Sequence, residues 1–522
     1  MLPVRRSHRR GIYEKKQRQA AFFAKNDDKP HGMWYNNTVL PLFGVKEMNK
    51  YKKLVFNTGI FAIGTFGSKV LIFLLTRLYA HNIDPVNNGI KDLLETTLLF
   101  LQPVFTFALQ EYLIRFGLDK EYDKREVFTT SGIITMTGML LMALTVPLLR
   151  GIPALDFLKG YTILFILYVA MSSVRMLCQN FVRSRDMLKL FSVDGILTTL
   201  MLLIFNIVFI SGMHMGVKGF LLAAILSDAF STVFLFIAAR LNNFVSADYF
   251  SKSLAKEMMR FAAPLIPTIV MWAITSLSDR MFIKQMHSDY HELGEGAVSI
   301  YGFANKIPNL ISLVSTIFFQ AWSMSAITEN SSADRNKFYE KVYSAYESIM
   351  FIAAAGLLII IKPVTSFLVP SDKFSEYSSV YMYTPILVTA VVFMCFNQFL
   401  GSIYSATKHS RNSCWTAMVA CVVNLLMNYF LIPLWGIQGA AVATLLSYLI
   451  CFWTRIIDAR YYVPFRFNGG KNILNMVLLL SMSGIIIADV KLGALWIIIL
   501  AAAVTAINYK ALLITVNKLL KR

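Results

Sequence analysis

Long apolar stretches alternate with short polar segments along the whole of this chain. A stretch of about 20 apolar residues is the length that crosses a bilayer as a helix. Such windows recur at 54 to 80, 89 to 116, 127 to 149, 158 to 180, 187 to 212, 216 to 239, 258 to 283, 297 to 324, 342 to 361, 380 to 402, 412 to 434, 436 to 457, 472 to 488 and 492 to 516. The pattern predicts an all-α polytopic membrane protein with about fourteen transmembrane helices.

The composition agrees with a chain that has lipid as its main solvent. Hydrophobic residues make up 56% of the 522 residues and charged residues only 15%, a balance that excludes an ordinary water-soluble domain. The five cysteines lie in or beside apolar windows without metal-ligand spacing. We therefore expect them to pack in the core, and we expect no metal and no cofactor.

The net charge of +20 is explained by membrane topology. Lys and Arg are concentrated in alternate loops. The positive-inside rule then predicts that both termini lie in the cytoplasm. We expect the chain to lie in the cytoplasmic (inner) membrane. No nucleic-acid partner is needed to account for the charge. The basic tail, residues 1–50, is either a surface that binds anionic lipid or a dispensable extension ahead of a second start at Met48.

An internal repeat indicates how the helices are organised. GVKGFLLAAILSD from Gly216 matches GIQGAAVATLLSY from Gly436, and in both segments the small residues form one helix stripe that allows close packing. The repeat predicts a first six-helix bundle over 51–247, a second over 248–467, and two extra C-terminal helices in 468–522. Bundles with an even number of spans keep the same orientation, which places a central cavity between them.

Three segments resemble one family. KKLVFNTGIFAIGTFGSKVLIFLLTRLYAHNIDPVNNG, ending at Gly89, resembles the opening of bacterial oligosaccharide flippases of the polysaccharide-biosynthesis family. YGFANKIPNL at Tyr301 is similar to the same family, as is YSATKHSRNSCWTAMVACVVNLLMNYFLIPLWGIQGAAVATLLSY from Tyr404, with its Asn-rich helix. The resemblance covers roughly residues 51 to 460.

This resemblance implies a fold, a mechanism and a substrate. The fold is that of the multidrug/oligosaccharidyl-lipid/polysaccharide exporter superfamily, and the mechanism is alternating access. The implied substrate is a polyprenyl-diphosphate-linked oligosaccharide, with membrane lipids and polysaccharide assembly proteins as further partners. Related lipid II flippases are an alternative, although the Gly-Phe-x-Arg-Asp type motif associated with their first span is replaced here by Gly67 followed by SKVLIF.

Cations within the apolar windows are the first candidates for the substrate site, because a charge in the bilayer core costs roughly 2.5 to 3.5 kcal/mol. Lys69 and Lys306 lie deep in their windows. Arg280 and Arg77 lie near the outer ends of the first spans of the two halves, where long side chains can also reach the headgroups. We expect these four side chains to form a cationic patch that binds the diphosphate.

Buried carboxylates are the candidates for coupling to a proton or a sodium ion. Asp228 has no basic residue within one helical turn, so it needs a partner on another helix, a proton or a cation. Glu95 is expected to pair with Arg77 or Lys91, and Asp194 with Lys189. Asp228 and Glu95 are the predicted ion-coupling residues.

Two rival functions remain open from the sequence. A cation-coupled multidrug exporter of the same superfamily would need an acidic and aromatic cavity. A membrane-embedded glycan transferase or polymerase would need paired carboxylates or a base in an exposed loop, and the outer loops are short. We therefore expect a transporter and not an enzyme.

Five prolines within the windows are expected to bend their helices: Pro103, Pro264, Pro267, Pro308 and Pro385.

Overall fold

The computed structural model describes residues 71–119, 121–149, 151–328, 335–372, 374–407 and 409–520. The chain divides into two units, 1–53 and 54–522, and all the described residues belong to the second unit. The predictions for the basic tail, for the second start at Met48 and for Lys69 lie outside the described residues. The regular structure of the described part is entirely helical, with short connecting loops and no strand.

Residues 71–82 form the end of the first described helix. The first half of the unit continues with α3 (Pro85–Phe105), α4 (Leu109–Leu118), α5 (Lys124–Leu149), η1 (Pro153–Leu158), α6 (Thr162–Ser184), α7 (Leu188–Asn206), the π-helix η2 (Ile207–Gly212) and α8 (Gly216–Ala238). The rest comprises η3 (Leu241–Phe244), η4 (Ala247–Tyr249), α9 (Lys252–Ala262), α10 (Ile266–Gln285), α11 (Glu295–Lys306), α12 (Asn309–Thr328), α13 (Arg335–Ile359), α14 (Ile361–Leu368), η6 (Ser375–Ser379), α15 (Val380–Thr407), α16 (Ser410–Tyr462), α17 (Gly469–Ile487) and α18 (Gly493–Leu520).

The helices confirm the predicted all-α membrane class. Among the described residues, eight helices are long and apolar enough to cross a membrane, or nine when α9 and α10 are counted as one bent span. Every predicted window from 89 onward falls on helix. Several of those helices are broken or merged, so the number of fourteen spans stays a prediction.

Three of the breaks lie at predicted prolines. The chain leaves the helix after Pro103 and passes through a left-handed residue at Ala108 before α4 begins. The axes of α9 and α10 meet at 53° around Pro264. The chain breaks between α11 and α12 at Pro308. Proline lacks the backbone N–H that would continue the helical ladder, which explains these positions.

The two repeated segments have the same backbone feature. Gly216 and Gly436 both have φ of +54°, a left-handed conformation that glycine adopts without the Cβ penalty. The helix α16 reverses its direction at Gly436. The evidence is that Asn412, near the start of α16, donates to Asp458, near the end of α16, at 2.9 Å. α16 is therefore a helical hairpin, with arms that correspond to the predicted windows 412 to 434 and 436 to 457.

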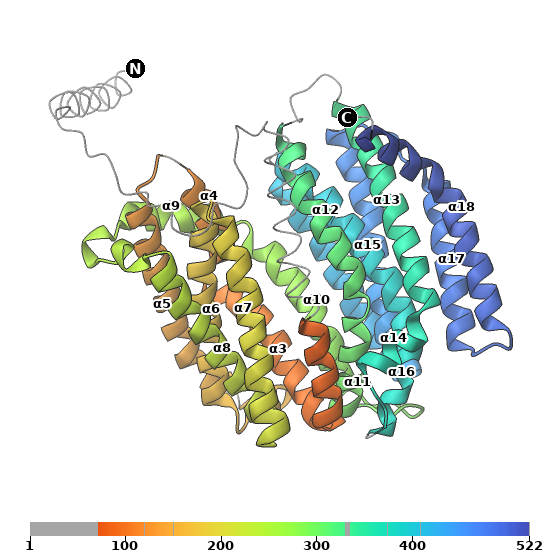
Figure 1. Ribbon diagram of the computed structural model, residues 1–522, viewed down its shortest axis with the longest axis horizontal. Helices are drawn as coiled ribbons and strands as arrows, with labels where there is room; N and C mark the ends of the chain where they lie inside the picture. The colour runs from red at the N-terminus through yellow and green to blue at the C-terminus, as the bar shows by residue number, and fades with distance from the viewer. Residues whose placement is uncertain are drawn as a thin grey trace, which may run out of the picture. The chain divides into compact units, whose positions relative to one another are not determined.

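Helix contacts show what surrounds the site (Figure 1). In the first half α6 packs on α5 and α8, and α7 packs on α8. In the second half α15 packs on α16, and α13 packs on α18. α3 belongs to the first half of the sequence but packs extensively on α10 and α11. The seam between the halves, formed by α3, α10 and α11, therefore lies next to any cavity between them.

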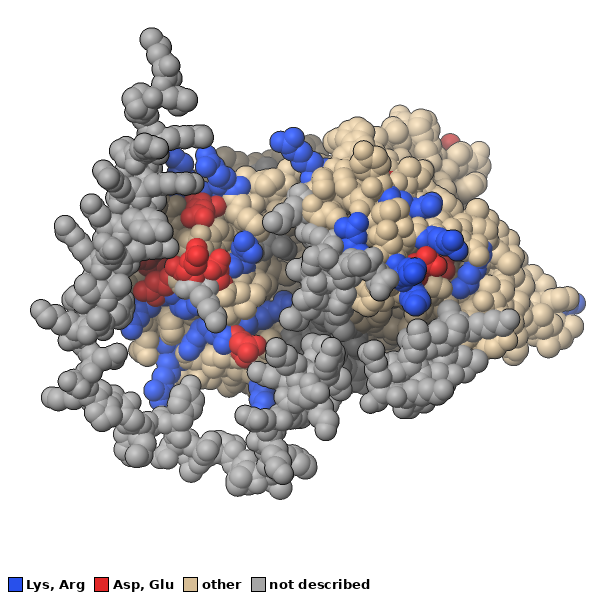
Figure 2. Space-filling model, turned by 90° about the horizontal axis from the view of Figure 1, so that it is seen from above, with Lys and Arg blue, Asp and Glu red and all other residues tan. Residues whose placement is uncertain are grey.

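Charged side chains gather at the end where α9 lies. Figure 2, viewed from that end, shows many Lys and Arg side chains together with a cluster of Asp and Glu on the visible surface. Exposed charge at the ends of apolar helices is what a membrane–water boundary requires. Which end faces the cytoplasm stays a prediction.

Candidate functional site

A cavity of about 410 Å³ lies at the seam between the halves. It is lined by residues of α3, α6, α10, α11, the start of α12, α15 and the second arm of α16. Its charged lining consists of Asp92, Glu95, Asp279, Arg280 and Lys306. A second cavity of about 270 Å³ shares Glu95 and Lys306 with it and extends toward residues 72–79. Two of the four predicted substrate-binding cations thus line one site.

Arg280 is neutralised across the seam by Asp92. Its Nε donates to Asp92 Oδ2 at 2.5 Å, and its Nη1 donates to the Ser276 carbonyl at 2.8 Å. Gly302 on α11 leaves the room for this carboxylate, because a Cβ at that position would lie 2.7 Å from Asp92 Oδ2. Arg280 thus points into the seam, with 11% of its side chain exposed, and its partner Asp92 was not predicted from the sequence.

Lys306 shares its carboxylate partner, Glu95, with a second cation, Lys91. Glu95 Oε2 lies 2.8 Å from Lys91 Nζ and 3.9 Å from Lys306 Nζ. Lys91 is fully buried, with its ammonium over the rings of Tyr79 and Phe220. The predicted Lys91–Glu95 pair is confirmed, and the alternative pair with Arg77 is not formed. Because Lys91 already neutralises Glu95, Lys306 presents the less compensated positive charge to the cavity.

Asp279 has four neutral donors and no cation. It accepts from the Tyr301 hydroxyl at 2.6 Å, from Asn428 at 2.7 Å, from Thr444 at 2.8 Å and from Asn424 at 2.9 Å. The side chain is buried, with 3% of the residue exposed. No Lys, Arg or His of the described residues pairs with it. The Asn-rich helix was the signal in the sequence for this cluster.

Asp228 lies in a separate cluster inside the first half. Its Oδ1 is 3.6 Å from Arg175 Nη1 on α6, and Arg175 Nη2 is 4.0 Å from Asp194 Oδ2 on α7. The expected partner on another helix is therefore Arg175. Asp194 also accepts from Ser231 at 2.5 Å. Its cationic partner in the described residues is Arg175 and not Lys189, so the predicted pair with Lys189 is wrong. Asp228 does not line the seam cavities that hold Glu95.

We expect Arg175→Gln to destabilise the protein by about 2 kcal/mol, because it leaves two buried carboxylates without their cation. The loss stays below the ~3 to 5 kcal/mol of a fully buried pair, since 23% of the Arg175 side chain is exposed. The measurement is thermal unfolding followed by a thiol-reactive dye, which reports exposure of the buried cysteines. Arg175→Lys should recover most of the loss. Equal stability of wild type and Arg175→Gln would remove the structural role of this cluster.

The C-terminal end of α10 forms an ion pair with the first half, between two residues that lie outside the apolar windows. Lys284 pairs with Asp156 of η1 and lies 3.5 Å from Glu295 of α11. The hydrogen bond from Lys284 lowers the pKa of the Asp156 carboxyl below its ordinary value. Near the same end of α3, a Cβ on Gly89 would lie 1.8 Å from the Glu295 carbonyl oxygen. The halves are therefore closed tightly at the end predicted to face outward.

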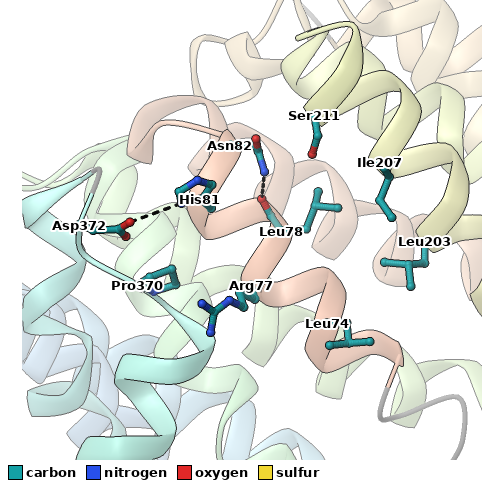
Figure 3. A pocket seen from close by; sticks show the side chains of 10 residues that line it. All are labelled: Leu74, Arg77, Leu78, His81, Asn82, Leu203, Ile207, Ser211, Pro370 and Asp372. Atoms are coloured by element: carbon teal, nitrogen blue, oxygen red, sulfur yellow. Dashed lines mark hydrogen bonds and ion pairs between the residues drawn. The ribbon is translucent and has the colours of Figure 1, made fainter.

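Arg77 is not brought to the seam cavity. Its Nη1 donates to the Phe367 carbonyl at 2.8 Å, and it lines a different cavity (Figure 3). Lys69 lies outside the described residues. The predicted patch of four cations is thus represented at the seam by Lys306 and Arg280 alone, each beside a carboxylate.

Several solved structures of similar fold are membrane transporters. Lipid II flippase MurJ in an inward closed conformation has 15% identity and a TM-score of 0.63, covering 88% of this chain and 99% of its own. A mutant of the Vibrio cholerae MATE transporter VcmN has 13% identity and a TM-score of 0.57, covering 79% and 97%. An inward-facing multidrug resistance MATE family transporter of the MOP superfamily has 15% identity and a TM-score of 0.58, covering 77% and 98%.

These identities establish the fold and not the substrate. A search of curated protein sequences finds no match. The family model described as polysaccharide biosynthesis protein matches residues 54–323, which is more than half of the 522 residues. The chain therefore belongs to the polysaccharide biosynthesis protein family, with the fold of the multidrug/oligosaccharidyl-lipid/polysaccharide exporter superfamily.

Proposed function

We propose that this protein flips a polyprenyl-diphosphate-linked oligosaccharide across the cytoplasmic membrane by alternating access, for export of cell-surface polysaccharide. The observation that supports this most is Lys306, a cation with 21% of its side chain exposed that lines both seam cavities. A diphosphate is the kind of anion that such an ammonium binds through charge-assisted hydrogen bonds.

The ion pairs at the seam give the substrate a way to act on the halves. The diphosphate competes with Glu95 for Lys306. It also competes with Asp92 for Arg280. When Lys306 leaves Glu95, that carboxylate keeps Lys91 as its partner. Because Asp92 and Glu95 are on α3 while the two cations are on α10 and α11, this exchange removes attraction across the seam. Substrate binding thereby favours the state in which the halves part.

The membrane potential supplies a driving force in the proposed orientation, with both termini cytoplasmic. Moving about two negative charges outward contributes roughly 4 to 5 kcal/mol per 100 mV. A proton or sodium ion bound at a carboxylate is an additional source. Glu95 is the better placed of the two predicted coupling residues, since it lies at the seam while Asp228 is held by Arg175.

A second candidate function has support in the same cavity. Three carboxylates and two tyrosines, Tyr168 and Tyr448, line it, and this acidic and aromatic lining suits a lipophilic cation. The fold similarity to MATE transporters fits this alternative, and the similarity to a lipid II flippase fits a different polyprenyl-linked substrate. The cation-coupled drug exporter is therefore tested alongside the flippase.

The test is translocation in proteoliposomes that contain the full-length protein and a membrane potential. Three substrates are compared, namely a labelled polyprenyl-diphosphate oligosaccharide, lipid II and rhodamine 6G. We expect movement of the oligosaccharide lipid, and we expect no net transport of rhodamine 6G. Transport of rhodamine 6G without any movement of either glycan lipid would overturn the proposal in favour of a drug exporter.

A further inference from the structure

The cavity that contains Arg77 is separate from the seam cavity and has a volume of about 450 Å³ (Figure 3). It lies between residues 71–82, the α7–η2 segment of the first half, and the residues that follow α14 in the second half. The site at the seam does not include it, since the two cavities share no lining residue. Its size, composition and place in the fold suit a ligand with an apolar part and an anionic part.

The polar side of this cavity has spare hydrogen-bond donors. Arg77 donates one hydrogen bond, from Nη1 to the Phe367 carbonyl, and its Cζ lies 4.7 Å from the centroid of the Phe367 ring. A guanidinium has five N–H donors, so several remain for a ligand. His81 lies one helical turn further along, so both side chains share a helix face. Asp372 lies 3.8 Å from His81, and among the described residues no carboxylate is within ion-pair distance of Arg77.

The other side of the cavity is apolar and open. Leu74 is 44% exposed and Ile207 is 48% exposed, and Leu203 completes the wall. Along residues 71–82 the order is therefore Leu74, Arg77, His81, from apolar to cationic to the polar end of the helix. That order matches a lipid whose chain lies in the bilayer and whose phosphate lies near the headgroups.

We propose that this cavity receives the diphosphate of the translocated polyprenyl-linked glycan in the outer leaflet. The inference rests on the proposed function and on the predicted orientation, which places the end near Asn82 outside. Two nitrogen-bearing side chains one turn apart suit two phosphate groups better than the single phosphate of an ordinary phospholipid. Two polar contacts at this cavity, Arg77 with the Phe367 carbonyl and His81 with Asp372, connect the two halves. The site therefore lies at the place where the halves separate during alternating access.

The experiment uses full-length protein in nanodiscs with a benzophenone amino acid in place of Leu203, or in place of Met394 of the seam cavity. The probe is a tritiated polyprenyl diphosphate without sugar, and phosphatidylglycerol is the competitor. We expect capture at position 203 that phosphatidylglycerol does not displace. Arg77→Gln should lower this capture about tenfold, which corresponds to one lost charge-assisted contact. Arg77→Lys should retain most of it.

Lys362→Gln is the matched control, because Lys362 is another half-exposed cation at the predicted outer end and it pairs with Asp489 away from the cavity. It should leave capture at position 203 unchanged. Unchanged capture in Arg77→Gln, or displacement by phosphatidylglycerol, would overturn the inference, and the second result would identify a phospholipid site. Capture at position 394 without capture at 203 would leave the proposed function standing while this inference fails. The reverse pattern would contradict the seam cavity as the substrate site, while a diphosphate-lipid site beside Arg77 would still stand.

Discussion

Lys306→Gln is expected to abolish export of the lipid-linked glycan, with a loss of about a hundredfold or more, while the protein remains folded. The substitution keeps hydrogen-bonding capacity and removes the positive charge that the diphosphate would contact, a contact of roughly 1.5 to 3 kcal/mol. The translocation step adds to the loss, because the exchange with Glu95 that weakens the seam can no longer occur. Folding survives because Glu95 keeps Lys91 at 2.8 Å.

The measurement is flipping in proteoliposomes together with thermal unfolding of the same preparation. Lys306→Arg should recover part of the export. Lys91→Gln is the contrasting variant, because Lys91 is fully buried and does not line the cavity, so its loss should reduce stability. Full export by Lys306→Gln would contradict a substrate-binding role for this residue. Recovery of export in Lys306→Gln by adding Glu95→Gln would reduce Lys306 to a structural partner of Glu95.

Gly439→Leu is expected to prevent folding. A Cβ at this position would lie 2.2 Å from the Leu431 carbonyl oxygen, inside the α16 hairpin, and backbone atoms cannot move aside as a flexible side chain can. Ordinary overpacking costs about 1 to 3 kcal/mol, and opening the hairpin exceeds that because α16 contacts both α10 and α15. We expect no monodisperse protein after extraction, as measured by size-exclusion chromatography.

Gly219 and Gly484 provide graded controls for this prediction. A Cβ on Gly219, the repeat counterpart of Gly439, would lie 3.1 Å from Met215 Cβ, so Gly219→Leu should be milder. In the described part of the chain, no atom outside the backbone of α17 and the chain neighbours of Gly484 lies within 4 Å of its Cβ position, so Gly484→Leu should be tolerated. Normal yield and thermal stability for Gly439→Leu would rule out the close packing of the hairpin.

The sequence was informative where an effect is local. Apolar windows predicted helices because membrane solvation acts on each segment separately, and prolines predicted breaks because they act on their own backbone. The repeat predicted equivalent segments, and both glycines indeed have the same left-handed φ. Lys91 could be predicted as a partner of Glu95, because residues four apart share a helix face.

The candidate site was harder to predict because its contacts join different helices. The pairs Arg280–Asp92 and Arg175–Asp228 depend on which helices pack together, and one sequence does not determine that. Lys189 failed as a partner of Asp194 because residues five apart do not share a face. The depth assigned to Arg280 assumed one straight span over 258 to 283, whereas the apolar helix is α10, with its axis at 53° to that of α9.

The position of α9 determines where the chain could be divided into separately produced parts. α9 packs on α4 and α5, and Glu257 accepts a hydrogen bond from Tyr122 at 2.7 Å, although α9 follows the predicted boundary at residue 247. A cut at that boundary would separate α9 from its packing partners and expose the apolar face of Leu254 and Met258. A cut at the short joint 263–265, between α9 and α10, would keep α9 with α4 and α5, and two co-expressed fragments would then assemble through the contacts of α3 with α10 and α11.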